Sequence, residues 1–252
     1  MDLKYASLRV LDLDGSQQIA TGADEMLVLP LAGSCAVTCG GETLELTGRA
    51  SVFDGATDFA YVPRNSVAVL TGTGRIALPG AVAGRDLPFR HGQAGDVPVE
   101  LRGAGSCSRY VRNFCMESTF DAGQLLACEV ITPAGNWSSY PPHKHDQDRP
   151  GEESVLEEIY YFEIGISQVG KSQVGKSGIG YMRVYASDDR EIDVLAEVRT
   201  GDRVLVPYGW HGPAMAVPGY DMYYLNVMAG PGERRWLICD DPAHAWIRET
   251  WT

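Results

Sequence analysis

The sequence is short of basic residues and has no long hydrophobic run. Lys and Arg together number 21 against 33 Asp and Glu, which gives a formal net charge of −12. Such an acidic chain lacks the basic surface that nucleic acids and anionic membranes require, although a local arginine can still bind a small anion. No apolar stretch approaches the length of a membrane span, and residues 1–5 show no apolar signal region. We therefore expect a cytoplasmic protein with no nucleic-acid or membrane partner.

Closely spaced cysteine pairs of the kind that form zinc ribbons are also scarce. The six cysteines are scattered singly, and only Cys35 and Cys39 lie as few as four residues apart. Because a zinc ribbon needs two such pairs, cysteine chemistry is not the expected function. We interpret the cysteines as buried free thiols in a reducing compartment.

Long helical periodicity is missing as well, and this favours an all-β protein. Short apolar runs separated by Gly-containing turns fill residues 26–70, a spacing typical of β-sandwiches and barrels. We predict two β-barrels, in domains 1–95 and 96–252, with a linker in the Gly- and Pro-rich segment 84–105. The first domain has His91 as its only histidine. It therefore suits a supporting or oligomerising role, and a homo-oligomer is compatible with it.

Histidines gather in the second half instead. His143 and His145 are two residues apart, so on a strand both imidazoles point to one face. A polar loop and an aromatic strand follow, and a hairpin would bring Glu158 back beside them. His211 comes after a short apolar strand and a Pro-Gly turn. Imidazoles with one carboxylate suit Zn, Mn, Fe or Ni, whereas Mg and Ca prefer more oxygen ligands.

These residues resemble the two motifs of the cupin superfamily. His143, His145 and Glu158 fit the first motif if an inserted loop separates the second histidine from the glutamate, and His211 fits the second motif one residue early. The resemblance implies two cupin-type β-barrels, a bicupin, in which the N-terminal barrel is degenerate. It also implies one divalent metal ion on His143, His145, Glu158 and His211, with Zn or Mn favoured and Fe or Ni as alternatives.

Longer blocks resemble the 5-deoxy-glucuronate isomerases of bacterial inositol catabolism. The blocks are residues 105–109, 135–146, 157–161, 209–213, 218–231 and 246–251. This resemblance implies an aldose–ketose isomerase that converts 5-deoxy-D-glucuronate to 5-dehydro-2-deoxy-D-gluconate by proton transfer through a metal-stabilised enediol. The alternatives are the related 4-deoxy-5-hexosulose-uronate ketol-isomerase, an iron dioxygenase and a sugar-binding cupin.

An isomerase also needs a base and groups that bind the sugar acid. Asp221 and Tyr223 are candidates for the base, beside a metal-bound hydroxide. Arg183 and Arg109 are candidates for the substrate carboxylate, because a guanidinium pairs with it bidentately. Trp210 and the tyrosines near residue 223 are expected to line the pocket, although core packing would explain them equally well.

Two overlapping matches to the phosphate-binding GxxxxGK[ST] pattern arise from a tandem copy of Ser-Gln-Val-Gly-Lys. They span residues 165–172 and 170–177. A P-loop needs a helix after the glycine-rich turn, whereas residues 178–185 are Gly-rich and then strand-like. We therefore expect no nucleotide cofactor.

Overall fold

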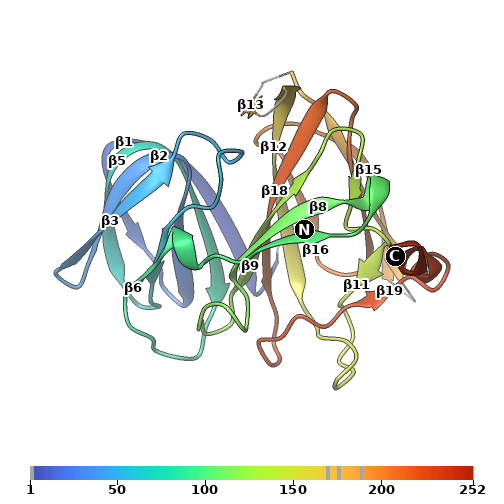
Figure 1. Ribbon diagram of the computed structural model, residues 1–252. Helices are drawn as coiled ribbons and strands as arrows, with labels where there is room; N and C mark the ends of the chain where they lie inside the picture. Colours follow the sequence, from blue (N-terminus) through green and yellow to red (C-terminus); the bar gives the residue numbers. More distant parts are fainter. Residues whose placement is uncertain (1–2, 169–170, 175–176, 188–189, 252) are drawn as a thin grey trace.

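The structure is a computed structural model that describes residues 3–168, 171–174, 177–187 and 190–251. Figure 1 shows two β-rich units beside each other, an N-terminal unit in blue and cyan and a C-terminal unit in green to red. Regular helices in the described residues are limited to three short 3₁₀ turns, η1 (Ala94–Asp96), η2 (Gly105–Cys107) and η3 (Ala245–Thr250). No helix in these ranges has the length and apolar character to cross a bilayer.

The N-terminal unit is built on one antiparallel sheet in the order β1-β5-β2-β4-β6, with β3 paired to β2. Its strands are β1 (Ala6–Ala20), β2 (Asp24–Cys39), β3 (Glu42–Arg49), β4 (Phe59–Val62), β5 (Val67–Val82) and β6 (Arg90–Gly92). The long strands β1, β2 and β5 alternate buried and exposed side chains along part of their length, so they enclose a core of their own that includes Val37 and Leu70.

The C-terminal unit contains two sheets. The seven-stranded sheet has the order β13-β12-β18-β9-β8-β7, with β16 on β12. Its strands are β7 (Val99–Arg102), β8 (Arg109–Cys115), β9 (Leu126–Thr132), β12 (Glu157–Gln168), β13 (Lys171–Val174), β16 (Arg203–Val206) and β18 (Tyr220–Ala229). The six-stranded sheet has the order β15-β14-β17-β11-β19, with β10 on β17. Its strands are β10 (Trp137–Ser138), β11 (His143–Lys144), β14 (Gly180–Ser187), β15 (Arg190–Val198), β17 (Trp210–Ala216) and β19 (Cys239–Asp240).

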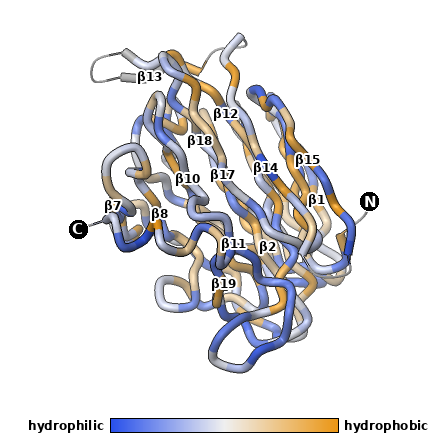
Figure 2. The backbone as a smooth tube through the Cα atoms, turned by 90° about the vertical axis from the view of Figure 1, so that its right-hand side faces the viewer, coloured by the Kyte–Doolittle hydropathy of each residue, from blue (hydrophilic) through white to orange (hydrophobic). Residues whose placement is uncertain are grey.

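In the centre of the seven-stranded sheet, along β9, β12 and β18, both faces are largely buried, because the N-terminal unit covers the outer face. Along β12, Tyr160 and Phe162 pack into the interior of the C-terminal unit, whereas Ile159 and Tyr161 pack against the N-terminal unit. Figure 2 shows hydrophobic stretches along the strands and hydrophilic loops at the end where β11 and β19 lie. The N-terminal unit thus supports the sheet that carries Glu158.

Buried polar contacts join the two units. The Glu25 carboxylate accepts hydrogen bonds from the backbone nitrogens of residues 123–125 at 2.6–2.7 Å, and from the Tyr61 hydroxyl at 2.6 Å. Arg49 of β3 forms an ion pair with Glu129 of β9, and both side chains are at most 3% exposed. These contacts fix the units relative to each other in addition to the apolar interface.

The predicted all-β fold is confirmed. The predicted domain boundary, between residues 95 and 96, lies within η1, and the segment predicted as linker contains β6 and β7. In the region of the P-loop matches, β13 pairs antiparallel with β12, so a hairpin takes the place of the strand, loop and helix that phosphate binding requires. Residues 169–170 and 175–176 of those matches lie outside the described ranges.

Candidate metal centre

Three buried imidazoles converge where β11 meets β17. His143 on β11 pairs directly with His211 on β17, and His145 follows two residues after His143. The ring centroids of His143 and His145 lie 4.4 and 4.7 Å from that of His211. One nitrogen from each ring lies within 4.8 Å of the others. The structure therefore brings together all three histidines predicted as ligands.

A backbone carbonyl orients each ring through Nδ1. The contacts are His143 to Pro141 O at 3.4 Å, His145 to Leu156 O at 2.9 Å and His211 to Gly209 O at 3.1 Å. Since a carbonyl oxygen only accepts, Nδ1 carries the hydrogen in the neutral ring, and Nε2 keeps its lone pair. Rings fixed in this way direct Nε2 toward one shared point, where a cation could bind.

Glu158 completes the set from β12. Its Oε2 atom lies 3.0 Å from Nε2 of His145 and 3.0 Å from Nε2 of His211. The inserted loop does not displace it, because the loop closes on itself. Leu156 N donates to His145 O at 2.9 Å, and His145 Nδ1 donates to Leu156 O at 2.9 Å. The chain therefore leaves the site after His145 and returns to it at Leu156, two residues before Glu158.

Charges in the centre suit a divalent cation. Burial by itself raises the pKa of Glu158, but the close contacts with the His145 and His211 imidazoles hold this pKa far below its usual value. Burial, together with the neighbouring His211, lowers the pKa of His143 well below its usual value. Burial also opposes protonation of His145, yet the Glu158 carboxylate raises the pKa of His145. An ionised carboxylate thus stands beside imidazoles, one of which is held neutral.

Within this group of four side chains, one buried atom has no hydrogen-bond partner among the described residues. Nε2 of His211 lacks an aligned hydrogen bond to any described residue, although it lies 3.0 Å from Glu158 Oε2. Orphaned buried polar atoms are rare in folded proteins, and a cation between the two atoms would satisfy both. His143, His145, Glu158 and His211 therefore fit a divalent metal, with three neutral nitrogens and one carboxylate as donors.

A cavity of about 290 Å³ adjoins this centre. Its lining includes the ligand residues His143 and Glu158 and three arginines. The remaining lining residues are Val111, Cys128, Val130, Ser139, Pro141, Tyr160, Tyr224, Asn226, Trp236 and Ile238. The arginines are Arg102, Arg109 and Arg248. A cavity that combines a metal-ligand set with guanidinium groups is suited to a small anion that also carries a metal-binding oxygen.

Among the three arginines that line the cavity, Arg109 is the one whose positive charge no carboxylate of the described residues compensates. It is only 6% exposed, and its guanidinium donates to Cys107 O at 3.0 Å. No carboxylate among the described residues pairs with it. The other two guanidiniums are neutralised in the pairs Arg102–Glu100 and Arg248–Asp240. Burial lowers the pKa of Arg109, which reflects the cost of an unpaired buried cation. An anionic ligand in the cavity would offset that cost.

Three hydroxyl groups form a connected chain on the cavity wall. Ser139 Oγ lies 3.0 Å from the Tyr160 hydroxyl and 3.2 Å from the Tyr224 hydroxyl. Burial raises the pKa of Tyr224 to about 12, so its hydroxyl stays protonated at neutral pH. The backbone of Ser139 lies close to β17, since a Cβ on Gly212 would meet Ser139 O at 1.8 Å. Glycine at position 212 therefore permits the packing that holds this chain in place.

The two predicted base residues lie on the wrong face of β18 to reach the cavity. Tyr224 and Asn226 line the cavity, so the alternating Asp221 and Tyr223 face outward. The Tyr223 hydroxyl donates to Glu129 Oε1 at 2.7 Å, beside the N-terminal unit. Asp221 accepts a hydrogen bond from Ala134 N at 2.7 Å. Neither side chain is placed to take a proton from a bound sugar.

Among the predicted substrate residues, Arg109 lines the cavity, and Arg183 and Trp210 do not. Arg183 forms an ion pair with Asp193 on the surface. Trp210 alternates with His211 on β17, and the Lys144 ammonium lies 5.5 Å from the centre of its indole ring. The structure thus separates the two arginines that the sequence treated as equivalent.

Several cavity residues were not anticipated. They are Arg102, Arg248, Ser139 and Tyr160. Tyr160 carried a usable signal, because it follows Glu158 by two residues on one strand and must share its face. Arg248 lies within the C-terminal block 246–251 that resembles the isomerases, but nothing local indicates that η3 reaches the cavity.

Comparison with known proteins gives concordant matches over the whole chain. The KduI/IolB family model matches residues 1–247. A protein of Bacillus licheniformis named 5-deoxy-glucuronate isomerase is 41% identical over 254 residues, which cover 98% of this chain and 89% of that protein. The protein with the same name from Halalkalibacterium halodurans is 42% identical, with the same shares covered.

Solved structures agree with the fold. The crystal structure of an IolB-like protein from Salmonella typhimurium superposes with a TM-score of 0.87 at 34% identity, covering 97% of this chain and 90% of the other. Lactobacillus farciminis oxalate decarboxylase superposes with a TM-score of 0.62 at 10% identity, covering 94% and 79%. The second likeness shows a shared fold alone.

Proposed function

Because the chain belongs to the KduI/IolB family, we propose that it is a metal-dependent aldose–ketose isomerase that converts 5-deoxy-D-glucuronate to 5-dehydro-2-deoxy-D-gluconate. One observation supports this most directly: the same cavity is lined by two of the proposed metal ligands, His143 and Glu158, and by the unpaired Arg109. The proposed substrate has a carbonyl beside a hydroxyl at one end and a carboxylate at the other. Each end therefore has a chemical counterpart in the cavity.

The roles of the residues follow from their chemistry. A divalent cation, Zn or Mn by the donor set, held by His143, His145, Glu158 and His211, would polarise the substrate carbonyl and stabilise negative charge on its oxygen. Arg109 would bind the carboxylate bidentately and fix the orientation of the sugar. The isomerisation moves one proton from C2 to C1 and one from O2 to O1, and needs no further reactant.

The hydroxyl chain suits the second of these transfers. Tyr160, Ser139 and Tyr224 each can donate and accept a hydrogen bond, and they are already connected at 3.0 and 3.2 Å. A proton lost from the substrate hydroxyl can pass along such a chain and return to the former carbonyl oxygen. Their burial keeps bulk water from competing for the same positions.

Proton NMR in D₂O tests the proposed reaction. We expect 5-deoxy-D-glucuronate incubated with the metal-loaded protein to lose its aldehyde signal and to gain deuterium at C1, and we expect a chelator to stop both changes. An unchanged spectrum would contradict the proposal. The same assay with 4-deoxy-5-hexosulose uronate, and oxygen uptake with the iron-loaded protein, would then distinguish the related isomerase from a dioxygenase.

The two arginines offer a matched pair of variants. Arg109→Ala should lower kcat/KM by roughly ten- to hundredfold, mostly through KM, because it removes a charge-assisted bidentate contact. Arg183→Ala should leave kcat and KM within about twofold of the parent values, since Arg183 pairs with Asp193 outside the cavity. Steady-state kinetics on both variants checks this. Equal effects of the two substitutions would remove Arg109 from substrate binding.

A further inference from the structure

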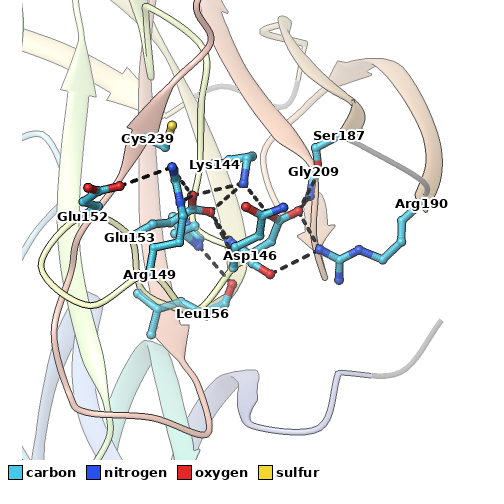
Figure 3. A network of polar contacts seen from close by, with 12 residues as sticks. Lys144, Asp146, Arg149, Glu152, Glu153, Leu156, Ser187, Arg190, Gly209 and Cys239 are labelled. Carbon is cyan, nitrogen blue, oxygen red and sulfur yellow. Dashed lines mark hydrogen bonds and ion pairs between the residues drawn. The ribbon is translucent and has the colours of Figure 1, made fainter.

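A buried charged network lies behind the metal ligands (Figure 3). Lys144 stands between His143 and His145 on β11, so its side chain points away from theirs. It is only 4% exposed. Its ammonium nitrogen lies 2.8 Å from Asp146 Oδ1 and 2.8 Å from Glu153 Oε1. Two carboxylates thus compensate one buried cation immediately beside the ligand strand.

The second oxygen of Asp146 reaches a different part of the chain. Asp146 Oδ2 accepts hydrogen bonds from Gly209 N at 2.9 Å and from Ser187 Oγ at 2.7 Å, and it pairs with Arg190 at 2.7 Å. Gly209 is the residue whose carbonyl oxygen orients the His211 ring at 3.1 Å. One carboxylate therefore connects the segment His143–His145, which carries two proposed ligands, to the turn before the third, His211.

Closure of the inserted loop does not account for these contacts, because the bonds between His145 and Leu156 close the loop and Glu153 holds its interior. The Glu153 carboxylate accepts from Asp146 N at 2.8 Å, Gln147 N at 3.1 Å and Arg149 Nε at 3.0 Å. All of these donors lie within or next to the loop. The Oδ2 contacts of Asp146 leave the loop and end on residues more than 40 positions away.

We propose that Asp146 is a positioning residue that holds the His143–His145 segment and the His211 turn in register for metal binding. This inference rests on the proposed metal centre. A carboxylate that accepts charge-assisted bonds on both oxygens has a fixed orientation, so it fixes the two backbone segments it joins. Groups that orient metal ligands from behind typically change metal affinity by about 10- to 100-fold when they are removed.

Metal affinity of the metal-free protein tests the proposal without any enzyme assay. Asp146→Asn keeps the size of the side chain but has only one acceptor oxygen. If that oxygen accepts from Gly209 N, the amide NH₂ group faces the Lys144 ammonium, and both of these are donors. We expect its affinity for Zn²⁺ and Mn²⁺, measured by competition with a chelating indicator, to fall about 10- to 100-fold. Asp148→Asn removes the same charge from an exposed position in the same loop, and should bind both metals within about twofold of the parent.

The outcomes separate this inference from the metal centre itself. A parent protein that binds neither metal would overturn the metal centre, and the inference with it. Metal binding by Asp146→Asn equal to that of the parent would overturn the inference alone, even if the melting temperature of the metal-free variant falls. If Asp146→Asn does not fold, Ser187→Ala takes its place. It removes one donor to Oδ2 and should weaken binding about three- to tenfold, whereas unchanged binding would refute the positioning role.

Discussion

His211→Ala should reduce turnover by at least about a thousandfold and leave the fold in place. The substitution removes the imidazole whose Nε2 atom has no aligned partner among the described residues. It leaves β17 paired with β10, β11 and β14, so we expect a loss of stability of only about 1–2 kcal/mol from the vacated space and the released Gly209 carbonyl. The D₂O assay measures turnover, the ratio of metal to protein measures occupancy of the proposed site, and thermal unfolding measures the loss of stability.

His91→Ala is the matched control for this variant. His91 lies in the N-terminal unit, 3.3 Å from an Asp58 oxygen, and does not line the cavity beside the metal centre. Its replacement should leave turnover and metal content near the parent values. Full activity of His211→Ala with metal retained would disprove the proposed metal chemistry, and equal losses in the two variants would indicate a general effect on folding.

Local spacing, together with the resemblance to cupins, was sufficient to predict that the three histidines converge. His143 and His145 share a strand face by their separation of two, and the Pro-Gly turn before His211 indicated the third ligand. The long gap before Glu158 was the uncertain feature. The structure resolves it through two hydrogen bonds between His145 and Leu156, both at 2.9 Å, which no sequence pattern reveals. Loop closure of this kind is a tertiary property.

The substrate side of the site could not be predicted in the same way, because it depends on strand register. In β18 the face of every residue follows from its pairing with β12, where Glu158 lies opposite Met228 and Tyr160 opposite Asn226. A sequence that contains consecutive tyrosines at 223 and 224 does not say which of them faces inward. Tyr223 was one of the candidate bases, whereas the register places Tyr224 in the cavity.

Long-range pairing also decided between the arginines. Arg109 and Arg248 both lie with their guanidinium carbons 5.1 Å from the centre of the Trp251 ring, although they are far apart in sequence. Nothing in the sequence distinguished Arg183 from Arg109 as a candidate for binding the substrate carboxylate. In the structure, Asp193 on the neighbouring strand neutralises Arg183. Whether an arginine keeps an uncompensated charge therefore depends on the partner that folding supplies.

Arg49→Met should destabilise the protein by about 3–5 kcal/mol at neutral pH. Arg49 and Glu129 form an ion pair between the two units, with side chains 3% and 2% exposed. Methionine fills much of the volume but leaves Glu129 with weaker compensation, an Arg112 nitrogen at 3.5 Å and the Tyr223 hydroxyl at 2.7 Å. Urea unfolding of the variant and the parent at about pH 7.5 measures the loss.

The pH dependence of this loss identifies its cause. Burial by itself raises the pKa of Glu129, and Arg49 lowers it below the usual value in the parent, so the parent gains stability above the unfolded pKa and loses it as pH falls. Without Arg49, burial should raise the folded-state pKa of Glu129. As pH falls, protonation of Glu129 then removes the cost of burying its unpaired charge in the variant. The stability difference should therefore shrink between about pH 7.5 and pH 5.

An exposed ion pair gives the comparison. Arg64→Met breaks the pair with Asp86, whose side chains are 27% and 88% exposed at a separation of 3.7 Å, and should cost less than about 1 kcal/mol at either pH. Equal costs for Arg49→Met and Arg64→Met would show that the buried pair does not join the units as we infer. A large cost that stays constant with pH would assign it to lost packing and to the carbonyl oxygens of Pro30 and Gly55, to which Arg49 also donates. Only a cost of Arg49→Met that becomes smaller as the pH is lowered would assign the loss of stability to the charge left on Glu129.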